Sequence, residues 1–113
     1  MTTKEQYNAH LQKSMADFGS WPEDVRTKIT AHMMEGNYKE TRLELHNKFF
    51  ADADKNADGM LDKDEFRAYQ EMWHAHMKSK FGDNVPFNEE IAAEAFDINR
   101  VSGKDGITQE DFQ

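Results

Sequence analysis

Oxygen-bearing side chains alternate along one short stretch of this 113-residue chain, from Asp54 to Glu65. Such alternation, followed by a bend and a closing carboxylate, is how a loop of about twelve residues surrounds a hard divalent cation such as Ca²⁺. Gly59 stands at the sixth position, where the backbone must turn sharply. The stretch therefore predicts a calcium site. The six predicted ligands are Asp54, Asn56, Asp58, the backbone carbonyl of Met60, Asp62 and Glu65.

A second register through the same residues fits less well. A loop that began at Asp52 would place Ala57 at the turn and Lys63 at the closing position. A lysine offers no anionic oxygen, so this register does not build a cation site. A simple acidic turn around Asp58-Gly59 would explain the glycine but not the whole pattern.

The Asp54–Glu65 stretch resembles the EF-hand, the helix-loop-helix calcium module of the calmodulin superfamily. The resemblance covers the loop and its flanking helices, and it implies that Glu65 closes the coordination sphere with both carboxylate oxygens. Because Glu65 belongs to the helix that leaves the loop, its ligation would move the aromatic residues that follow on that helix. The layout of the chain also resembles the calcium-binding proteins of the ciliate cell cortex.

A second acidic stretch begins at Asp97 and departs from this pattern. Read as a loop of twelve residues, it places the apolar Val101 at the fifth position. Aligning Ile107 with Leu61 instead gives a loop of 15 residues that ends at Asp111. Two interpretations stay open: a weaker site that tolerates Mg²⁺, or a metal-free partner whose Ile107 pairs with Leu61 across a short two-stranded bridge. The candidate ligands of the weaker site are Asp97, Asn99, Asp105 and Glu110 or Asp111.

Hydrophobic periodicity and capping signals predict five helices around these loops. In the first helix, four apolar residues recur at helical spacing and form one stripe: Tyr7, Leu11, Met15 and Phe18. The five helices are expected from Thr3 to Phe18, from a Ser20-Trp21-Pro22-Glu23 cap to Gly36, from Lys39 to Ala53, from Asp62 to Phe81, and from an Asn88 cap into the second acidic stretch.

The expected fold is all-α and forms a single domain over residues 1–113. A helical hairpin over 1–37 precedes a pair of EF-hands: one over 38–81 with the intact loop, and a degenerate one over 87–113. The chain stops before the exiting helix of the second hand, so we expect it to be part of a longer protein with further EF-hands. The apolar stripe and the position of the hairpin lead to the hypothesis that the hairpin covers a groove of the EF-hand pair when calcium is absent.

Composition narrows the function classes. The chain has 14 basic and 22 acidic residues, a formal net charge of −8, which disfavours nucleic-acid binding and favours cations or basic partner segments. It has no cysteine, so disulfides and thiolate metal sites are excluded. Spanning a bilayer takes about 20 apolar residues, and the sequence has no such run. His74 and His76 point to opposite sides of their helix, and no nucleophile or phosphate loop is recognisable, so we do not expect an enzyme.

The predicted function is reversible calcium binding coupled to helix rearrangement. We expect a calcium sensor that presents an apolar groove to a basic amphipathic helix of a target protein. The alternatives are a calcium buffer and a structural module of a cortical or cytoskeletal assembly. The expected location is the cytoplasm, with the cortical cytoskeleton as the more specific location.

Overall fold

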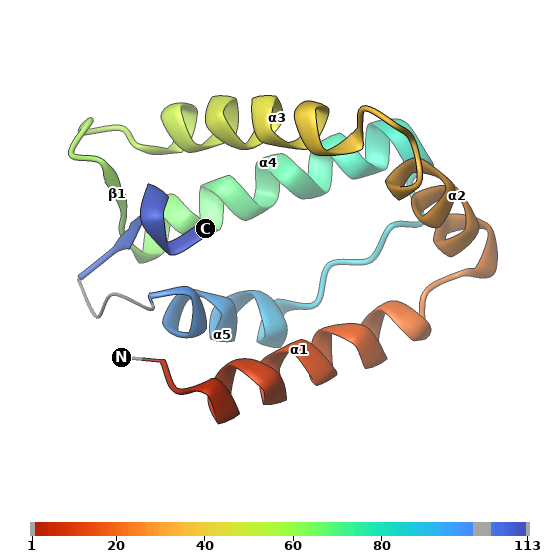
Figure 1. The fold of residues 1–113 in the computed structure, drawn as a ribbon, viewed down its shortest axis with the longest axis horizontal. Coiled ribbons are helices and arrows are strands. Elements are labelled where there is room, and N and C mark those ends of the chain that lie inside the picture. The colour runs from red at the N-terminus through yellow and green to blue at the C-terminus, as the bar shows by residue number, and fades with distance from the viewer. Residues whose placement is uncertain (1, 101–104, 113) are drawn as a thin grey trace.

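The structure, a computed structural model, describes residues 2–100 and 105–112 of the chain. Most of these residues are helical, as predicted, and two short strands pair beside the first loop (Figure 1). The helices start and end within about three residues of the bounds that periodicity and caps predict. The elements are α1 (Lys4–Gly19), α2 (Glu23–Met33), α3 (Tyr38–Ala53), β1 (Met60–Leu61), α4 (Lys63–Phe81), α5 (Glu89–Asn99), β2 (Ile107–Thr108) and the 3₁₀ helix η1 (Gln109–Phe112).

Side-chain caps explain where two of the helices begin. The Thr3 side chain accepts from the backbone N–H of Gln6 at the start of α1, and the Asn88 side chain accepts from that of Ile91 at the start of α5. The predicted Ser20 cap of α2 is wrong. Ser20 instead ends α1, where its hydroxyl donates to the Asp17 carbonyl at 2.6 Å, and α2 starts without a side-chain cap.

The first hydrophobic core lies between α3, α4, α5 and the strand pair. Strands β1 and β2 are antiparallel, with Leu61 opposite Ile107, and both side chains are fully buried. The predicted pairing of these two residues is therefore confirmed. The core is formed by Phe50, Ala53, Leu61, Phe66, Tyr69, Ala95, Phe96 and Ile107.

A second core lies at the far end of α4. Val25 and Ile29 of α2 are buried against Phe81 and Val85, so α2 covers the end of α4 that is remote from the loop. Helix α1 lies along α5 instead (Figure 1). The first two helices therefore do not pack along one another as the predicted hairpin would, because each finds its main partner in the second half of the chain.

Most of the apolar stripe of α1 faces solvent, while Phe18 at its end packs against the second core. Tyr7, Leu11 and Met15 are 46 %, 44 % and 65 % exposed, and no residue of α1 is buried. These three residues therefore cover no groove in this structure, and the masking of a groove by the hairpin in the absence of calcium stays a prediction. The helical period correctly places these residues on one face, but the helix turns its neighbouring, polar face to α5.

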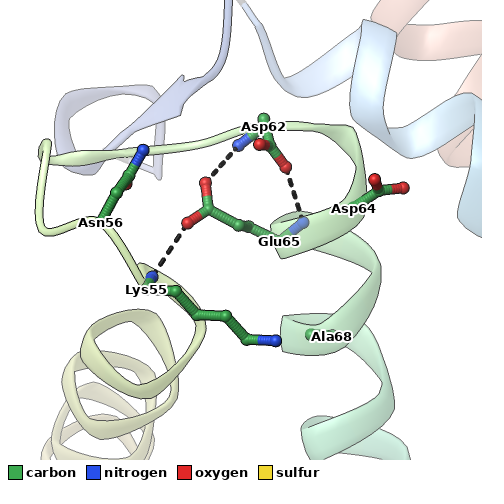
Figure 2. A pocket seen from close by; sticks show the side chains of 6 residues that line it. All are labelled: Lys55, Asn56, Asp62, Asp64, Glu65 and Ala68. Carbon is green, nitrogen blue, oxygen red and sulfur yellow. Dashed lines mark hydrogen bonds between the residues drawn. The ribbon is translucent and has the colours of Figure 1, made fainter.

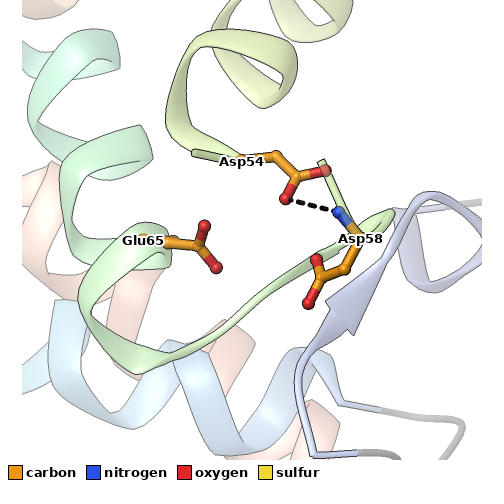
Figure 3. A group of neighbouring side chains, drawn as sticks. All are labelled: Asp54, Asp58 and Glu65. Atoms are coloured by element: carbon orange, nitrogen blue, oxygen red, sulfur yellow. Dashed lines mark hydrogen bonds between the residues drawn. The ribbon is translucent and has the colours of Figure 1, made fainter. Parts of the chain in front are cut away.

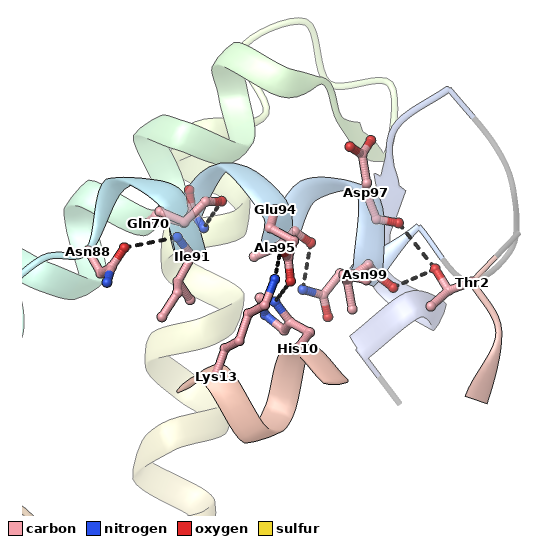
Figure 4. A network of polar contacts seen from close by, with 12 residues as sticks. Thr2, His10, Lys13, Gln70, Asn88, Ile91, Glu94, Ala95, Asp97 and Asn99 are labelled. Carbon is pink, nitrogen blue, oxygen red and sulfur yellow. Dashed lines mark hydrogen bonds and ion pairs between the residues drawn. The ribbon is translucent and has the colours of Figure 1, made fainter. Parts of the chain in front are cut away.

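Polar groups attach α1 to α5 (Figure 4). Glu94 accepts from Lys13 Nζ at 2.8 Å and lies 3.0 Å from the His10 ring. The Thr2 hydroxyl lies within 3.1 Å of the Asp97 and Ile98 carbonyls, where it can satisfy the open end of α5. The N-terminal segment therefore reaches the residues that begin the second loop.

Within the described ranges, no helix is both long and apolar enough to cross a membrane.

Candidate metal centre

Three carboxylates converge in the loop between α3 and α4. Asp54 follows the last residue of α3, Asp58 lies in the turn, and Glu65 is in the first turn of α4. Each offers one oxygen, and these three oxygens all lie within 4.8 Å of one another (Figure 3). The structure therefore brings together three of the six predicted ligands, from both ends and the middle of the loop.

Backbone N–H groups hold the first two carboxylates in place. The Asp54 carboxylate accepts from Asp58 N at 3.3 Å and from Gly59 N at 2.9 Å, and Asp58 accepts from Met60 N at 3.0 Å. Gly59 has a φ of 81°, the left-handed conformation predicted for this position. Ala57 is also left-handed, with a φ of 52°, which the sequence did not indicate. The loop is thus bent so that its acidic side chains turn inward.

The Glu65 carboxylate joins the two ends of the loop (Figure 2). Its Oε2 accepts from Lys55 N at 2.9 Å and its Oε1 from Asp62 N at 3.1 Å, while the Asp62 side chain accepts from Glu65 N at 2.8 Å. The pair of bonds with Asp62 is a capping box that starts α4. Glu65 is buried, so this carboxylate already lies inside the loop rather than in solvent. Each carboxylate oxygen has a second lone pair with which it can bind a cation.

Two of the remaining predicted ligands share a pocket with Glu65, although Asp54 and Asp58 do not line it. Asn56 and Asp62 line an open pocket of about 300 Å³ together with Glu65. In Figure 2 the Asn56 side chain rises from the near side of the loop and Asp62 sits above Glu65. Met60 is the first residue of β1, so its backbone is fixed by pairing with Thr108. The pocket is lined by Lys55, Asn56, Asp62, Asp64, Glu65 and Ala68.

The electrostatics of the loop favour a cation. The hydrogen bond from Met60 N–H holds the pKa of the Asp58 carboxyl below its ordinary value, and contacts with Asp54 and Asn56 act in the same direction. Asp58 therefore stays ionised at neutral pH. Carboxylates this close repel one another, and a bound cation relieves that repulsion.

The cluster is compact enough for one divalent cation to contact all three carboxylates. Oxygen ligands lie about 2.3–2.6 Å from Ca²⁺, so two oxygens that bind one ion lie at most about 5.2 Å apart, and these three oxygens meet that limit. Asp54, Asp58 and Glu65 would hold the ion.

The candidate ligands of the second loop have other partners. Asp97 pairs with Arg100 at 2.9 Å, and Asn99 donates to the Ala95 carbonyl at 2.8 Å (Figure 4). Asp105 is exposed. Among the described residues, these carboxylates do not form a second cluster of three. Val101 and the Glu110 side chain lie outside the part of the chain that the structure describes.

Asp111 occupies the position in the second loop that Glu65 has in the first. Its buried carboxylate accepts from Thr108 N at 2.9 Å, as Glu65 accepts from Asp62 N. This bond, together with the β1–β2 register, agrees with the alignment of 15 residues and not with the loop of twelve. The shorter aspartate lies inside η1 and binds back to the residue that directly precedes this helix.

The sequence did not reveal one participant, the backbone N–H of Lys55. It donates to Glu65 and so closes the loop. A main-chain donor is present at nearly every residue, so no residue type marks this one.

Comparison of this chain with protein-family models, with curated proteins and with solved structures found no match. The interpretation of the site therefore rests on its residues and their geometry.

Proposed function

We propose that this chain binds Ca²⁺ reversibly in the loop between α3 and α4, in the manner of an EF-hand. The observation that carries the proposal is the convergence of Asp54, Asp58 and Glu65 within 4.8 Å, in a loop whose ligand pattern is complete. Asn56, Asp62 and the Met60 carbonyl would complete the coordination sphere. A bound Ca²⁺ supplies the positive charge that neutralises these oxygens.

The positions of the ligands connect binding to the fold. Asp54 ends α3 and Glu65 begins α4, so an ion bound to both residues joins the two helices. Phe66 follows Glu65 directly and Tyr69 lies one turn later, and both are buried in the first core. A small displacement of Glu65 would therefore be passed to that core. This connection supports a role as a calcium sensor whose altered surface binds a basic amphipathic segment of a target protein.

A second candidate function, a calcium buffer, is favoured by one observation. The Glu65 carboxylate is already buried and held by Lys55 N and Asp62 N, so it needs no large movement to bind the ion. Buffers of this kind change conformation little on binding. Trp73 packs against the first core and can distinguish the two functions. A sensor should change its Trp73 emission and bind more apolar dye with calcium, whereas a buffer should change neither.

Calorimetry of the purified chain in chelator-treated buffer tests calcium binding itself. We expect one site in the first loop, with a dissociation constant on the order of 10⁻⁷ to 10⁻⁵ M for Ca²⁺ and weaker binding of Mg²⁺. Glu65→Gln keeps the shape of the side chain but removes its charge, and it should weaken Ca²⁺ binding at least about tenfold. Glu44→Gln on the exposed side of α3 is the matched control and should bind as the wild type does. Absence of heat from the wild type would refute the proposal.

A further inference from the structure

One histidine connects three elements of the fold. His46 lies on α3, its Nδ1 is 2.7 Å from the Tyr69 hydroxyl of α4, and its Nε2 is 2.9 Å from Oε1 of Gln109 in η1. The ring is also packed edge-on against Tyr69, with centroids 5.7 Å apart, and lies 6.0 Å from the Phe50 ring. These ring contacts fix the orientation in which both nitrogens reach a partner.

The hydrogen bonds have a defined direction. Gln109 Oε1 can only accept, so the proton of a neutral imidazole is on Nε2. Nδ1 then accepts the proton of the Tyr69 hydroxyl. The result is a chain of two bonds from α4 through α3 to η1. Such bonds weaken steeply as the donor and acceptor move apart, so a displacement well below 1 Å changes them.

The ends of this chain lie next to the two loops. Tyr69 is four residues after Glu65, on the same face of α4, and both side chains are buried. Gln109 directly follows β2 and precedes the buried Asp111 by two residues. His46 itself lies about two helical turns before Asp54. Both helices that flank the first loop and the segment that ends the second loop therefore meet at one imidazole.

We propose that His46 is a positioning residue that couples calcium binding in the first loop to the position of η1 in the second. The inference rests on the proposed function, because the first loop must bind the ion for anything to be transmitted. Movement of α4 or α3 around the bound loop alters the Tyr69–His46–Gln109 bonds, and η1 shifts with them. The β1–β2 pair is a separate, main-chain link between the loops. The histidine adds a side-chain link that single substitutions can remove.

Tyr69→Phe tests this link, since it removes the hydroxyl and keeps the packed ring. The readout is an amide correlation spectrum of the full chain, titrated with Ca²⁺. In the wild type we expect the amides of the first loop and those of Gln109 and Asp111 to respond together. In Tyr69→Phe the first loop should still respond with a similar calcium affinity, while the shifts at Gln109 and Asp111 should fall at least twofold. Tyr7→Phe, on the exposed stripe of α1, should behave as the wild type does.

A second variant and a second signal separate coupling from simple destabilisation. His46→Phe removes both bonds and should reduce the Gln109 and Asp111 shifts at least as much as Tyr69→Phe does. The imidazole ¹⁵N signals of the wild type should report a protonated Nε2 and should change with calcium. Undiminished shifts at Gln109 and Asp111 in Tyr69→Phe would overturn the coupling while calcium binding at the first loop stands. A wild type whose first loop does not respond to Ca²⁺ would overturn both proposals.

Discussion

At the scale of single residues, Gly106 has the most crowded surroundings of the glycines that the structure describes. A Cβ at this position would lie 2.7 Å from the Leu61 carbonyl oxygen and 3.1 Å from its carbon, and both atoms belong to the backbone. Backbone atoms cannot rotate away as the end of a flexible side chain can. Only glycine therefore lets the strand that starts at Ile107 approach Leu61. The approach is needed because Leu61 and Ile107 form the centre of the first core.

Gly106→Ala should therefore destabilise the protein through overpacking. We expect a loss of roughly 1–3 kcal/mol in the free energy of unfolding, measured by urea denaturation. Gly36→Ala is the matched control, because a Cβ there meets nothing within 4 Å and its φ is not left-handed. The control should change the free energy of unfolding little or raise it slightly. Equal effects at the two glycines would contradict this account of the strand pair.

At the scale of elements, the attachment of α1 to α5 depends on charge. The pair with Lys13, and then that with His10, holds the pKa of the Glu94 carboxyl below its ordinary value of 4.5. A carboxyl whose folded pKa is lowered stabilises the folded state above its unfolded pKa. That contribution is lost as the pH falls through the lowered folded value. The link between the two helices is therefore present at neutral pH, weakens as the pH falls below about 4.5, and is lost only when the pH falls below the lowered folded pKa.

Glu94→Gln should lower the melting temperature slightly at pH 6, and the difference from the wild type should be smaller at pH 3, which is below the ordinary pKa of the carboxyl. The effect is small because the ion pair is partly exposed and solvent screens it. Glu44→Gln on the exposed side of α3, outside the first turn of that helix, serves as the control, with no difference expected at either pH. Thermal unfolding followed by circular dichroism measures both. A Glu94→Gln difference that persists unchanged at pH 3 would show that charge is not what holds α1.

The elements also show which features the sequence could predict. Helical periodicity and caps located all five helices, and the alignment of Ile107 with Leu61 located the strand pair. Periodicity groups residues on one face but does not say which neighbour covers that face. For this reason the exposure of Tyr7, Leu11 and Met15 was not predicted.

The candidate site, too, could be predicted only in part from the sequence. The spacing of oxygen side chains predicted that Asp54, Asp58 and Glu65 share a loop, and the structure brings their oxygens within 4.8 Å. The donor at Lys55 N and the left-handed Ala57 were not predicted, because both are backbone properties without a characteristic residue type. The contacts of His46 were not predicted for another reason. Its partners are 23 and 63 residues away, and no local pattern indicates them.

At the scale of the whole molecule, α4 connects the two cores. Phe66 and Tyr69 belong to the first core, near the loop, and Phe81 belongs to the second, at the other end of the helix. A helix cannot lose one end of its packing without weakening the other, because its hydrogen bonds form cooperatively. The two cores should therefore unfold together although they share no buried residue.

The two tryptophans can test this cooperativity. Trp21 packs against the second core and Trp73 against the first. Trp73→Phe leaves the reporter of the second core, and Trp21→Phe leaves the reporter of the first. In each variant, the urea midpoint from tryptophan emission should coincide with that from far-ultraviolet circular dichroism. An emission midpoint in Trp73→Phe well below its dichroism midpoint would mean that α2 separates from α4 before the rest unfolds.

Dissolved salt should act on α1 in two ways, one through its ion pair with α5 and one through its outward-facing apolar stripe. Added electrolyte shortens the range of the Lys13–Glu94 attraction and so loosens the helix from α5. Strongly hydrated anions such as sulfate also raise the free energy of exposed apolar side chains in water. They therefore favour burial of Tyr7, Leu11 and Met15 against an apolar surface. Sodium chloride and ammonium sulfate at equal ionic strength should screen the charges of the molecule alike. Ammonium sulfate should nevertheless promote its association through the exposed apolar residues more strongly.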